Sequence, residues 1–382
     1  MTSIDPYLNL VIAHKASDLH LSTEHQPRLR VDGQIQMIGT DIISAEKIGA
    51  LLQEIMPDYA KDDFKQYHDA DFSYKHPARN IRFRINAFTD RKGPGLVARA
   101  ISESIPTLEQ LGMPEVLKEF CELNKGLFIV TGPTGSGKST TLAAMLDYIN
   151  ANRSDHIITI EDPIEYVHES KQCLVNQREI PQQATCFSRA LRAALREDPD
   201  VILVGEMRDL ETVEIAIETA ETGHLVFGTL HTTTAYNAVD RIIDIFPQGR
   251  QSQIRTMLAS SLQGVLAQTL CKKQGGGRIA ATELLVSTDA AANMIREGTM
   301  HQIPSLMQTG GSLGMHLMED SLARLTAAKL ISPEEAWHRA DDKDLLQKRF
   351  AVQGVFWAPM EDAEKQEEAN SYNDETDWLR DE

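Results

Sequence analysis

A glycine-rich segment carries the clearest chemical signal in the chain. It reads Gly132-Pro133-Thr134-Gly135-Ser136-Gly137-Lys138-Ser139 and fits the pattern G-x-x-x-x-G-K-[ST] in full. An apolar run at 126–131 precedes it and a helical pattern at 138–150 follows it, which is the context that the pattern requires. Glycines allow backbone N–H groups to surround phosphate oxygens, and a helix N-terminus favours negative charge. The segment therefore predicts a binding site for a nucleoside triphosphate.

The individual residues of this segment have distinct expected roles toward two cofactors, ATP and Mg²⁺. Lys138 is expected to place a positive charge on the β- and γ-phosphates, and the Ser139 hydroxyl to ligate Mg²⁺. The predicted nucleotide contacts are Gly132, Pro133, Thr134, Gly135, Ser136, Gly137, Lys138, Ser139 and Thr140.

Carboxylates follow two further apolar runs, and hydrolysis needs such groups to hold magnesium and orient water. Glu206 follows the run at 201–204, and because position 205 is glycine rather than the usual aspartate, Glu206 is the nearest carboxylate. Glu161 and Glu165 lie in an acidic cluster after the run at 157–160. Either cluster alone could equally be a solvated turn. Together with the glycine-rich segment, we expect at least two of the three to be catalytic and Glu206 to be a magnesium ligand.

Two histidines bracket the apolar run at 225–230. A lone histidine in such a place is usually structural, and for His224 the structural and functional interpretations are equally plausible. His231 follows the run and precedes three threonines, a pattern that resembles a sensor of the γ-phosphate. We therefore expect His231, at the carboxyl end of its strand, to be a catalytic-site residue.

The elements expected to position these residues fall into two parts. The segment 4–101 reads as a small α+β domain, with helices at 7–14 and 44–55 and strands at 17–21, 29–31, 72–74 and 81–88. After a linker, short apolar strands at 126–131, 156–160, 201–204 and 225–230 alternate with helical segments, which implies a parallel sheet. From about Gln251 the pattern becomes mostly helical, and from Pro359 it is acidic and typical of disorder. The predicted boundaries are 1–105, a linker at 106–114, 115–357, and a tail at 358–382.

Composition narrows the class of protein. The chain has 382 residues and a net charge of −18, which argues against a long nucleic-acid footprint. No apolar run approaches the ~18 residues that span a bilayer, and the N-terminus has no signal-peptide pattern, so a cytoplasmic protein without a transmembrane segment is expected. The four cysteines lie far apart and form no C-x-x-C pair, so neither a zinc ribbon nor a disulfide framework is supported.

Four motifs in order resemble those of the secretion-superfamily ATPases of type IV pili and type II secretion. They are the segment 132–139, an acidic box at 160–165, a second phosphate-site strand at 203–209, and a histidine box from 223 to 232. The resemblance covers roughly 17–348 and implies a PAS-like N-terminal domain, a RecA-like P-loop ATPase domain and a homo-hexameric ring. It also implies MgATP hydrolysis coupled to mechanical work.

Within that family the chain resembles the retraction branch, PilT and its paralogue PilU. The assembly ATPases usually carry a four-cysteine zinc motif, whereas the segment 268–278 of this chain has only Cys271. The acidic tail and the sequence Ala290-Ala291-Ala292-Asn293, where an isoleucine and an arginine are usual, make PilU the closer match. This implies a role in pilus retraction and twitching motility, accessory to a PilT-like motor, with a self-sufficient motor or a related secretion ATPase as alternatives.

The resemblance also implies roles for two arginines and for partners. Arg84 and Arg99 match the family's N-terminal-domain arginines that close onto nucleotide, although without the resemblance an arginine stripe would be a solvated strand face. The implied partners are a PilT-like retraction ATPase and an inner-membrane platform protein, with the chain held peripherally at the pilus base and no nucleic acid bound.

Three other classes of protein remain as alternatives. A P-loop kinase would need an acceptor pocket, and ATP turnover without an acceptor would argue against it. A DNA translocase would need a basic stripe, which the charge of −18 does not favour. A non-catalytic ring subunit is disfavoured because Lys138, Ser139 and Glu206 are all present.

Overall fold

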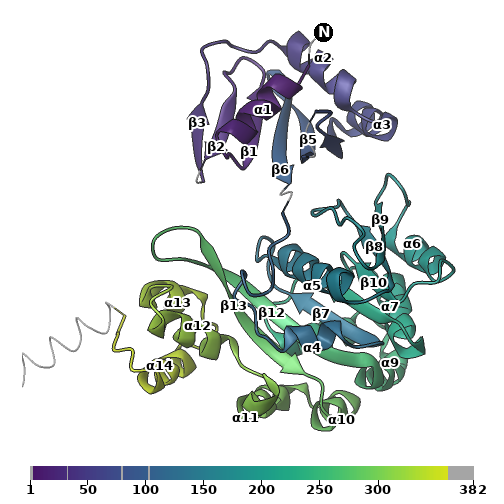
Figure 1. Cartoon of the computed structure of the whole chain (residues 1–382), viewed down its shortest axis with the longest axis vertical. Helices are drawn as coiled ribbons and strands as arrows, with labels where there is room; N and C mark the ends of the chain where they lie inside the picture. The colour runs from purple at the N-terminus through teal and green to yellow at the C-terminus, as the bar shows by residue number, and fades with distance from the viewer. Residues whose placement is uncertain (1–2, 32, 79–80, 102–103, 360–382) are drawn as a thin grey trace, which may run out of the picture. The chain divides into compact units, whose positions relative to one another are not determined.

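The computed structural model describes residues 3–31, 33–78, 81–101 and 104–359. The chain forms two compact units, and each contains two separate stretches of sequence. One unit comprises Met1–Pro106 with Leu146–Glu206, and the other comprises Thr107–Met145 with Met207–Glu382. Figure 1 labels most of the helices and strands of the two units.

An antiparallel sheet covered by helices forms the N-terminal part of the first unit. Within the described residues it has six strands in the order β3-β2-β1-β6-β5-β4. The strands are β1 (Asp18–Ser22), β2 (Arg28–Val31), β3 (Gln34–Met37), β4 (Asp69–Lys75), β5 (Arg82–Asp90) and β6 (Gly93–Ile101), and the helices are α1 (Asp5–Ala13), α2 (Ala45–Ile55) and α3 (Asp58–Tyr67). The helix expected after Ser44 is confirmed, because the Ser44 hydroxyl accepts a hydrogen bond from the Lys47 N–H.

The two faces of this sheet differ sharply in chemistry. On β5, Phe83, Ile85 and Ala87 are fully buried, whereas Arg82 and Arg84 point to the other face. The alternation expected for residues 81–88 is therefore confirmed. Register places Arg84 opposite Arg99 of β6, and Arg99 opposite Asp18 of β1, so that a row of charged side chains crosses the sheet.

The rest of the first unit is built from parallel strands. β8 (His156–Glu161) pairs on one side with β10 (Val201–Val204) and on the other with β9 (Leu174–Glu179), and α6 (Phe187–Ala194) lies between β9 and β10 in sequence. Strands β8 and β10 are buried along most of their length, as expected for a parallel sheet. Strand β9 was not expected from the sequence.

The second unit holds the glycine-rich segment. Its strands are β7 (Gly126–Thr131), β11 (Leu225–Thr229), β12 (Leu262–Lys272) and β13 (Arg278–Val286), with β7 parallel to both β11 and β12. The helices that precede β12 in this unit are α4 (Leu117–Cys121), α5 (Lys138–Asn152), α7 (Leu210–Thr222), α8 (Ala235–Asp244) and α9 (Gln248–Ser261). Helix α5 begins in this unit and ends in the first one. The strand order β13-β12-β7-β11-β10-β8-β9 describes one mixed, mostly parallel sheet, so the predicted α/β fold class is confirmed.

The prediction of mostly helical structure from Gln251 onward is wrong for residues 262–286. These residues form an antiparallel hairpin of β12 and β13, and its turn contains Gly275, Gly276 and Gly277 at positive φ. A short apolar run such as 262–271 does not reveal its period, so a buried strand is easily mistaken for a buried helix. The remaining helices are α10 (Asp289–Glu297), α11 (Ile303–Thr309), α12 (Met318–Ala327), α13 (Pro333–Arg339) and α14 (Lys343–Val352).

Two expectations from the sequence concern residues that the structure does not describe. The acidic tail from Pro359 lies outside the described residues, apart from Pro359 itself. The sequence pair Asp32-Gly33 predicts a hairpin turn, and its Asp32 also lies outside the described residues. Among the helices of the described residues, none combines the length and apolarity needed to cross a bilayer.

Candidate nucleotide-binding site

The glycine-rich segment joins the end of β7 to the start of α5 in a conformation that only glycine adopts readily. Gly132, Gly135 and Gly137 have φ of 143°, 79° and 91°. A Cβ on Gly132 would lie 2.3 Å from the Gln268 carbonyl oxygen, so no larger residue fits. The Lys138 ammonium donates to the carbonyls of Gly132 at 2.8 Å and Pro133 at 3.2 Å, which holds its charge inside the loop.

A buried glutamine on β12 supports this loop, and the sequence patterns did not single it out. The Gln268 Nε2 donates to the Ser136 carbonyl at 2.7 Å, and its Oε1 accepts from the Thr141 hydroxyl at 2.9 Å. Gln268 therefore connects the loop to the first turn of α5. The sequence does offer one signal for Gln268, which is a polar residue within the apolar run at 262–271. Polar side chains that are buried usually form hydrogen bonds.

Hydrogen bonds between a side-chain hydroxyl and the backbone connect the histidine box to the end of β7, where the same loop begins. The Thr131 hydroxyl donates to the Thr232 carbonyl at 2.8 Å and accepts from the Thr232 N–H at 2.9 Å. His231 immediately precedes Thr232 and is exposed, so it lies at the loop end of β11 as predicted. His224 lies at the other end of that strand, where its ring nitrogen contacts the Thr219 carbonyl at 3.2 Å, which fits a structural role.

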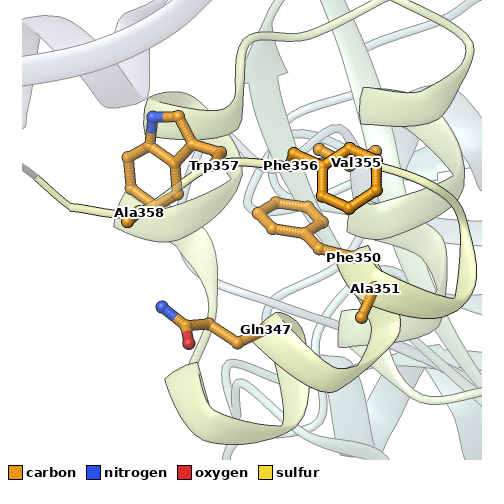
Figure 2. A pocket seen from close by; sticks show the side chains of 7 residues that line it. All are labelled: Gln347, Phe350, Ala351, Val355, Phe356, Trp357 and Ala358. Carbon is orange, nitrogen blue, oxygen red and sulfur yellow. The ribbon is translucent and has the colours of Figure 1, made fainter. Parts of the chain in front are cut away.

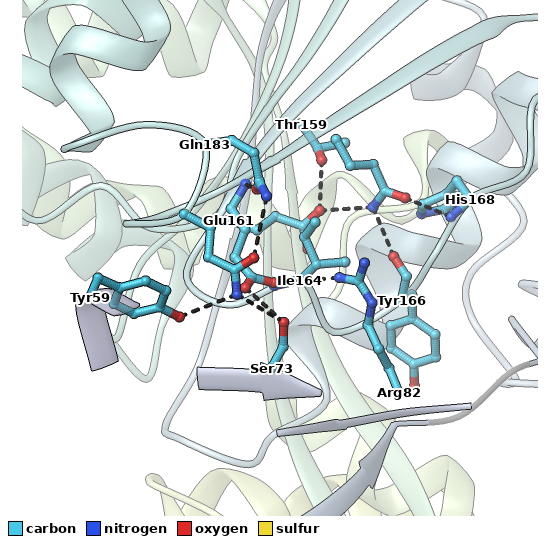
Figure 3. A network of polar contacts seen from close by, with 12 residues as sticks. Tyr59, Ser73, Arg82, Thr159, Glu161, Ile164, Tyr166, His168 and Gln183 are labelled. Atoms are coloured by element: carbon cyan, nitrogen blue, oxygen red, sulfur yellow. Dashed lines mark hydrogen bonds and ion pairs between the residues drawn. The ribbon is translucent and has the colours of Figure 1, made fainter. Parts of the chain in front are cut away.

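In the first unit, Glu161 ends β8 and its carboxylate is held by two neighbours. Its Oε1 accepts from the Thr159 hydroxyl at 2.7 Å (Figure 3) and from the Gln177 amide at 3.1 Å. Burial raises the pKa of Glu161 to about 7, although these two hydrogen bonds act in the opposite direction. A carboxylate with such a pKa can exchange a proton near neutral pH. Glu165 lies four residues further on and is exposed.

Glu206 lies beside this acidic box, and the structure explains the glycine before it. The Gly205 N–H donates to the Ile160 carbonyl at 2.8 Å. A Cβ at position 205 would lie 2.9 Å from that oxygen and 3.2 Å from the Glu161 Cα. The aspartate usual at this position would therefore collide with the acidic box, and Glu206, which is half-buried, follows at the strand end.

Arg84 and Arg99 are each paired with a carboxylate of their own sheet. The Arg84 Nε donates to Asp71 at 3.0 Å, and Asp71 raises the pKa of Arg84, with smaller contributions from Glu165 and Asp162. The Arg99 Nε donates to Asp18 at 2.8 Å. Burial opposes the ionisation of Asp18, but hydrogen bonds from Ser17 and Arg99 hold its pKa below the ordinary value. Asp18 thus fixes the position of Arg99, whose own side chain is mostly exposed.

The predicted site residues therefore fall into two groups. The glycine-rich segment, including Ser139 and Thr140, lies with His231 in the second unit. Glu161, Glu165 and Glu206 lie in the first unit. The acidic box also acts on β5, because the negative charges of Glu165 and Asp162 help to raise the pKa of Arg84. Thr159 and Gln177 join Gln268 as polar supports that sequence reasoning missed.

The loop has the features that a triphosphate and magnesium would need. Three glycines have the positive φ that lets a loop turn its N–H groups toward an anion, and Lys138 supplies a cation at the start of α5. The Ser136 hydroxyl is buried without a hydrogen-bond partner, which is the state expected of a group that binds a ligand oxygen. Magnesium is usually bound by few protein groups together with phosphate oxygens, and the Ser139 hydroxyl can supply one such ligand. Bound magnesium would neutralise charge on the phosphates.

A hollow elsewhere in the second unit has a different character. Figure 2 shows its lining by α14 and the residues after it, namely Gln347, Phe350, Ala351, Val355, Phe356, Trp357 and Ala358. None of these side chains is charged, so the hollow is unsuited to a triphosphate.

Comparison with known proteins identifies the family. A model of the type II/IV secretion system protein family matches residues 1–293. The chain belongs to this family. It is 54% identical over 325 residues to the type IV pilus retraction ATPase PilT of Pseudomonas aeruginosa, covering 85% of this chain and 94% of that protein. It is 39% identical to the type IV pilus ATPase PilU of the same organism over 89% of each chain, so identity favours PilT over the predicted closer match to PilU.

Solved structures of secretion-family proteins agree with the fold. A crystal structure of the pilus retraction motor PilT with bound ADP is similar with a TM-score of 0.85 and 44% identity, covering 91% of this chain and 99% of that one. The ATPase DotB of Legionella pneumophila is similar with a TM-score of 0.77 and 27% identity, covering 87% and 93%. The resemblance inferred from the four motifs is therefore confirmed.

Proposed function

We propose that this chain hydrolyses MgATP as the subunit of a motor that supports type IV pilus retraction and twitching motility. The observation that carries the catalytic part is the complete phosphate loop, with Lys138 held inside it by backbone carbonyls and Gln268 supporting it. The similarity to PilT over 94% of that protein supports the biological part. The domain boundaries predicted above are kept as part of this proposal.

Each site residue has a proposed task in this reaction. Lys138 and the loop N–H groups bind the phosphates, Ser139 and Glu206 act on the magnesium side, and Glu161 or Glu165 orients and deprotonates water. His231, beside Thr232 at the loop, senses the γ-phosphate. Arg84 and Arg99 contribute positive charge to the transition state.

The assembly and location are also proposals. We infer a homo-hexamer that works in the cytoplasm at the base of the pilus, attached peripherally to an inner-membrane platform protein. The tail at 361–382 contains ten acidic residues and two basic ones, and this net charge of −8 would favour a basic partner surface.

Two versions of the cellular role differ in whether the motor needs a partner. We propose an accessory role beside a PilT-like ring because Ala291 and Ala292 of α10 stand where the resemblance leads us to expect an isoleucine and an arginine. Ala291 is fully buried, so the replacement removes packing volume as well as charge. The second candidate is a self-sufficient motor, which the higher identity to PilT than to PilU favours.

The proposal is tested by ATP turnover of the purified chain without any added acceptor, compared with Lys138→Ala. The wild type is expected to release phosphate, and the variant to remain folded and lose activity, because Lys138 is a charge clamp rather than a core residue. Equal turnover in both would remove the loop from the mechanism. Retraction in cells that lack every PilT-like paralogue separates the two roles, since normal retraction there would contradict the accessory one.

A further inference from the structure

A buried carboxylate, Glu179, ends β9 within the first unit. Glu179 is only 2% exposed, and both of its oxygens have partners. Its Oε1 accepts from the Ser73 hydroxyl at 2.9 Å. Its Oε2 accepts from the Ile164 N–H at 3.1 Å and lies 3.6 Å from the Arg82 guanidinium. Burying a charged group costs free energy unless it is paired and hydrogen-bonded, so the burial of Glu179 depends on these three partners.

The partners of Glu179 come from two regions that are distant in sequence. Ser73 and Arg82 lie on β4 and β5 of the N-terminal sheet, whereas Ile164 lies within the acidic box that contains Glu161 and Glu165. Figure 3 shows Ser73, Arg82 and Ile164 converging on one place. One side chain therefore connects the N-terminal sheet to the acidic box.

The backbone next to Glu179 holds the other end of the same box. Glu161 and Glu179 are register partners in the parallel pair β8–β9, and the Ile180 N–H donates to the Glu161 carbonyl at 2.8 Å. The acidic box is thus fixed at Glu161 by the backbone of Ile180 and at Ile164 by the Glu179 side chain. A displacement of Glu179 would move both points.

Neighbouring polar contacts strengthen this connection. The Gln182 amide donates to the Tyr59 hydroxyl and to the Ser73 hydroxyl, each at 3.2 Å. The Gln183 Oε1 accepts from the Glu179 N–H at 2.7 Å and so fixes the end of β9.

We propose that Glu179 is a positioning residue that transmits the position of β4 and β5 to the acidic box. This inference rests on the proposed ATPase function. A shift of the N-terminal sheet would pull on Arg82 and Ser73, and Glu179 would carry the shift to Ile164 and hence to the Glu161 and Glu165 carboxylates. Arg84 follows Arg82 by two residues and shares its face of β5, so the same movement also repositions Arg84.

The test uses the full-length chain with Glu179→Gln, Arg82→Gln and the double variant, together with Arg82→Lys. Lys75→Ala is the matched control, because Lys75 is an exposed cation directly opposite Arg82 on β4. Three quantities are measured: the kcat for ATP, the KM for ATP, and hydrogen exchange of the backbone amides at 162–166. If Glu179→Gln does not fold, Arg82→Gln alone still tests the connection, because the Arg82 side chain is 30% exposed.

The expected result is a loss of kcat of about tenfold in Arg82→Gln and in Glu179→Gln, with KM changed less than about twofold, because coupled pairs typically interact at this level. The double variant should lose little more than either single one, and Arg82→Lys should recover most of the activity. Exchange at Ile164 should accelerate in both single variants and not in Lys75→Ala.

The inference is overturned if the two losses multiply, or if exchange at 162–166 is unchanged when Arg82 is replaced. If the wild type has no ATPase activity, the proposed function fails, while the exchange measurement still decides whether Glu179 connects the two regions. If the wild type is active and every variant matches Lys75→Ala, the proposed function stands and this inference fails.

Discussion

Gln268 donates a hydrogen bond of 2.7 Å to the carbonyl of Ser136, a residue 132 positions earlier in the chain. The same side chain accepts from Thr141, so one amide holds both the phosphate loop and the first turn of α5. The interaction is possible because β12 pairs in parallel with β7, the strand that leads into the loop. Gln268 therefore makes the loop depend on a strand that carries none of the predicted site residues.

Gln268→Leu is expected to weaken nucleotide binding and to lower stability. Leucine fills a similar volume but leaves the Ser136 carbonyl and the Thr141 hydroxyl without their partner, at a cost of about 1–3 kcal/mol for each buried group left unsatisfied. Titration with a fluorescent nucleotide and thermal denaturation measure the two effects. Gln274→Leu, at an exposed position on the same hairpin, is the control and should affect neither. Unchanged nucleotide affinity in Gln268→Leu would show that the loop keeps its shape without this support.

The pH dependence of ATP turnover tests whether Glu161, rather than Glu206, is the carboxylate that must be ionised for hydrolysis. Because burial raises the pKa of Glu161 to about 7, a reaction that needs ionised Glu161 should accelerate as pH rises, with a midpoint near pH 7. Glu206→Gln should slow turnover while keeping ATP binding and the same midpoint. Glu161→Gln should abolish the midpoint. The measurement is kcat at saturating MgATP between pH 5.5 and 8.5, a range chosen to span about 1.5 pH units on each side of neutrality. A midpoint that persists in Glu161→Gln would assign the base elsewhere.

Sequence reasoning located the parts of the site that are local in the chain. The phosphate loop, Glu206 and His231 each follow an apolar run, and a run that ends in a polar residue marks the end of a buried strand. Gln268 was missed because its role depends on which strand lies beside β7, and strand order is not readable from spacing. Glu179 and Gln177 were missed because β9 is an edge strand whose last four residues, 176–179, are all polar, so the sequence shows no apolar run there. The partners of Arg84 and Arg99 depend on cross-strand register, which a single strand does not encode.

Arg84→Ala is expected to lower turnover more than nucleotide affinity. Positive charge that reaches the γ-phosphate only in the transition state contributes to kcat rather than to ground-state binding, and removing one such group typically costs on the order of a hundredfold. The values of kcat and KM for ATP measure the two effects. Asp71→Ala is the control, since Asp71 is the ion-pair partner of Arg84. If Asp71→Ala reproduces the whole defect, Arg84 acts only through that pair. A loss of affinity with kcat unchanged would contradict the proposed role.

Glu283 is expected to make the stability of the protein depend on pH. Its side chain is 4% exposed on β13, and its Oε1 accepts from the Ala235 N–H at the start of α8 at 2.7 Å. Burial raises the pKa of Glu283 from 4.5 to about 7, so the folded chain binds the proton more tightly than the unfolded chain. The stabilisation is fully present below pH 4.5 and is lost as pH rises toward 7, by up to about 3 kcal/mol. Glu319, whose pKa burial also raises, acts in the same direction.

Glu283→Gln isolates this contribution, because the amide oxygen can still accept from Ala235 and carries no charge. The difference in melting temperature between wild type and variant should therefore favour the variant increasingly as pH rises from 5 to 7 and should then level off, following the titration of a single group with a pKa of about 7. Glu297→Gln, an exposed glutamate at the end of α10, should show no such trend. A difference that does not vary with pH would mean that Glu283 is ionised in the folded chain throughout this range, with the α8 N-terminus stabilising its charge.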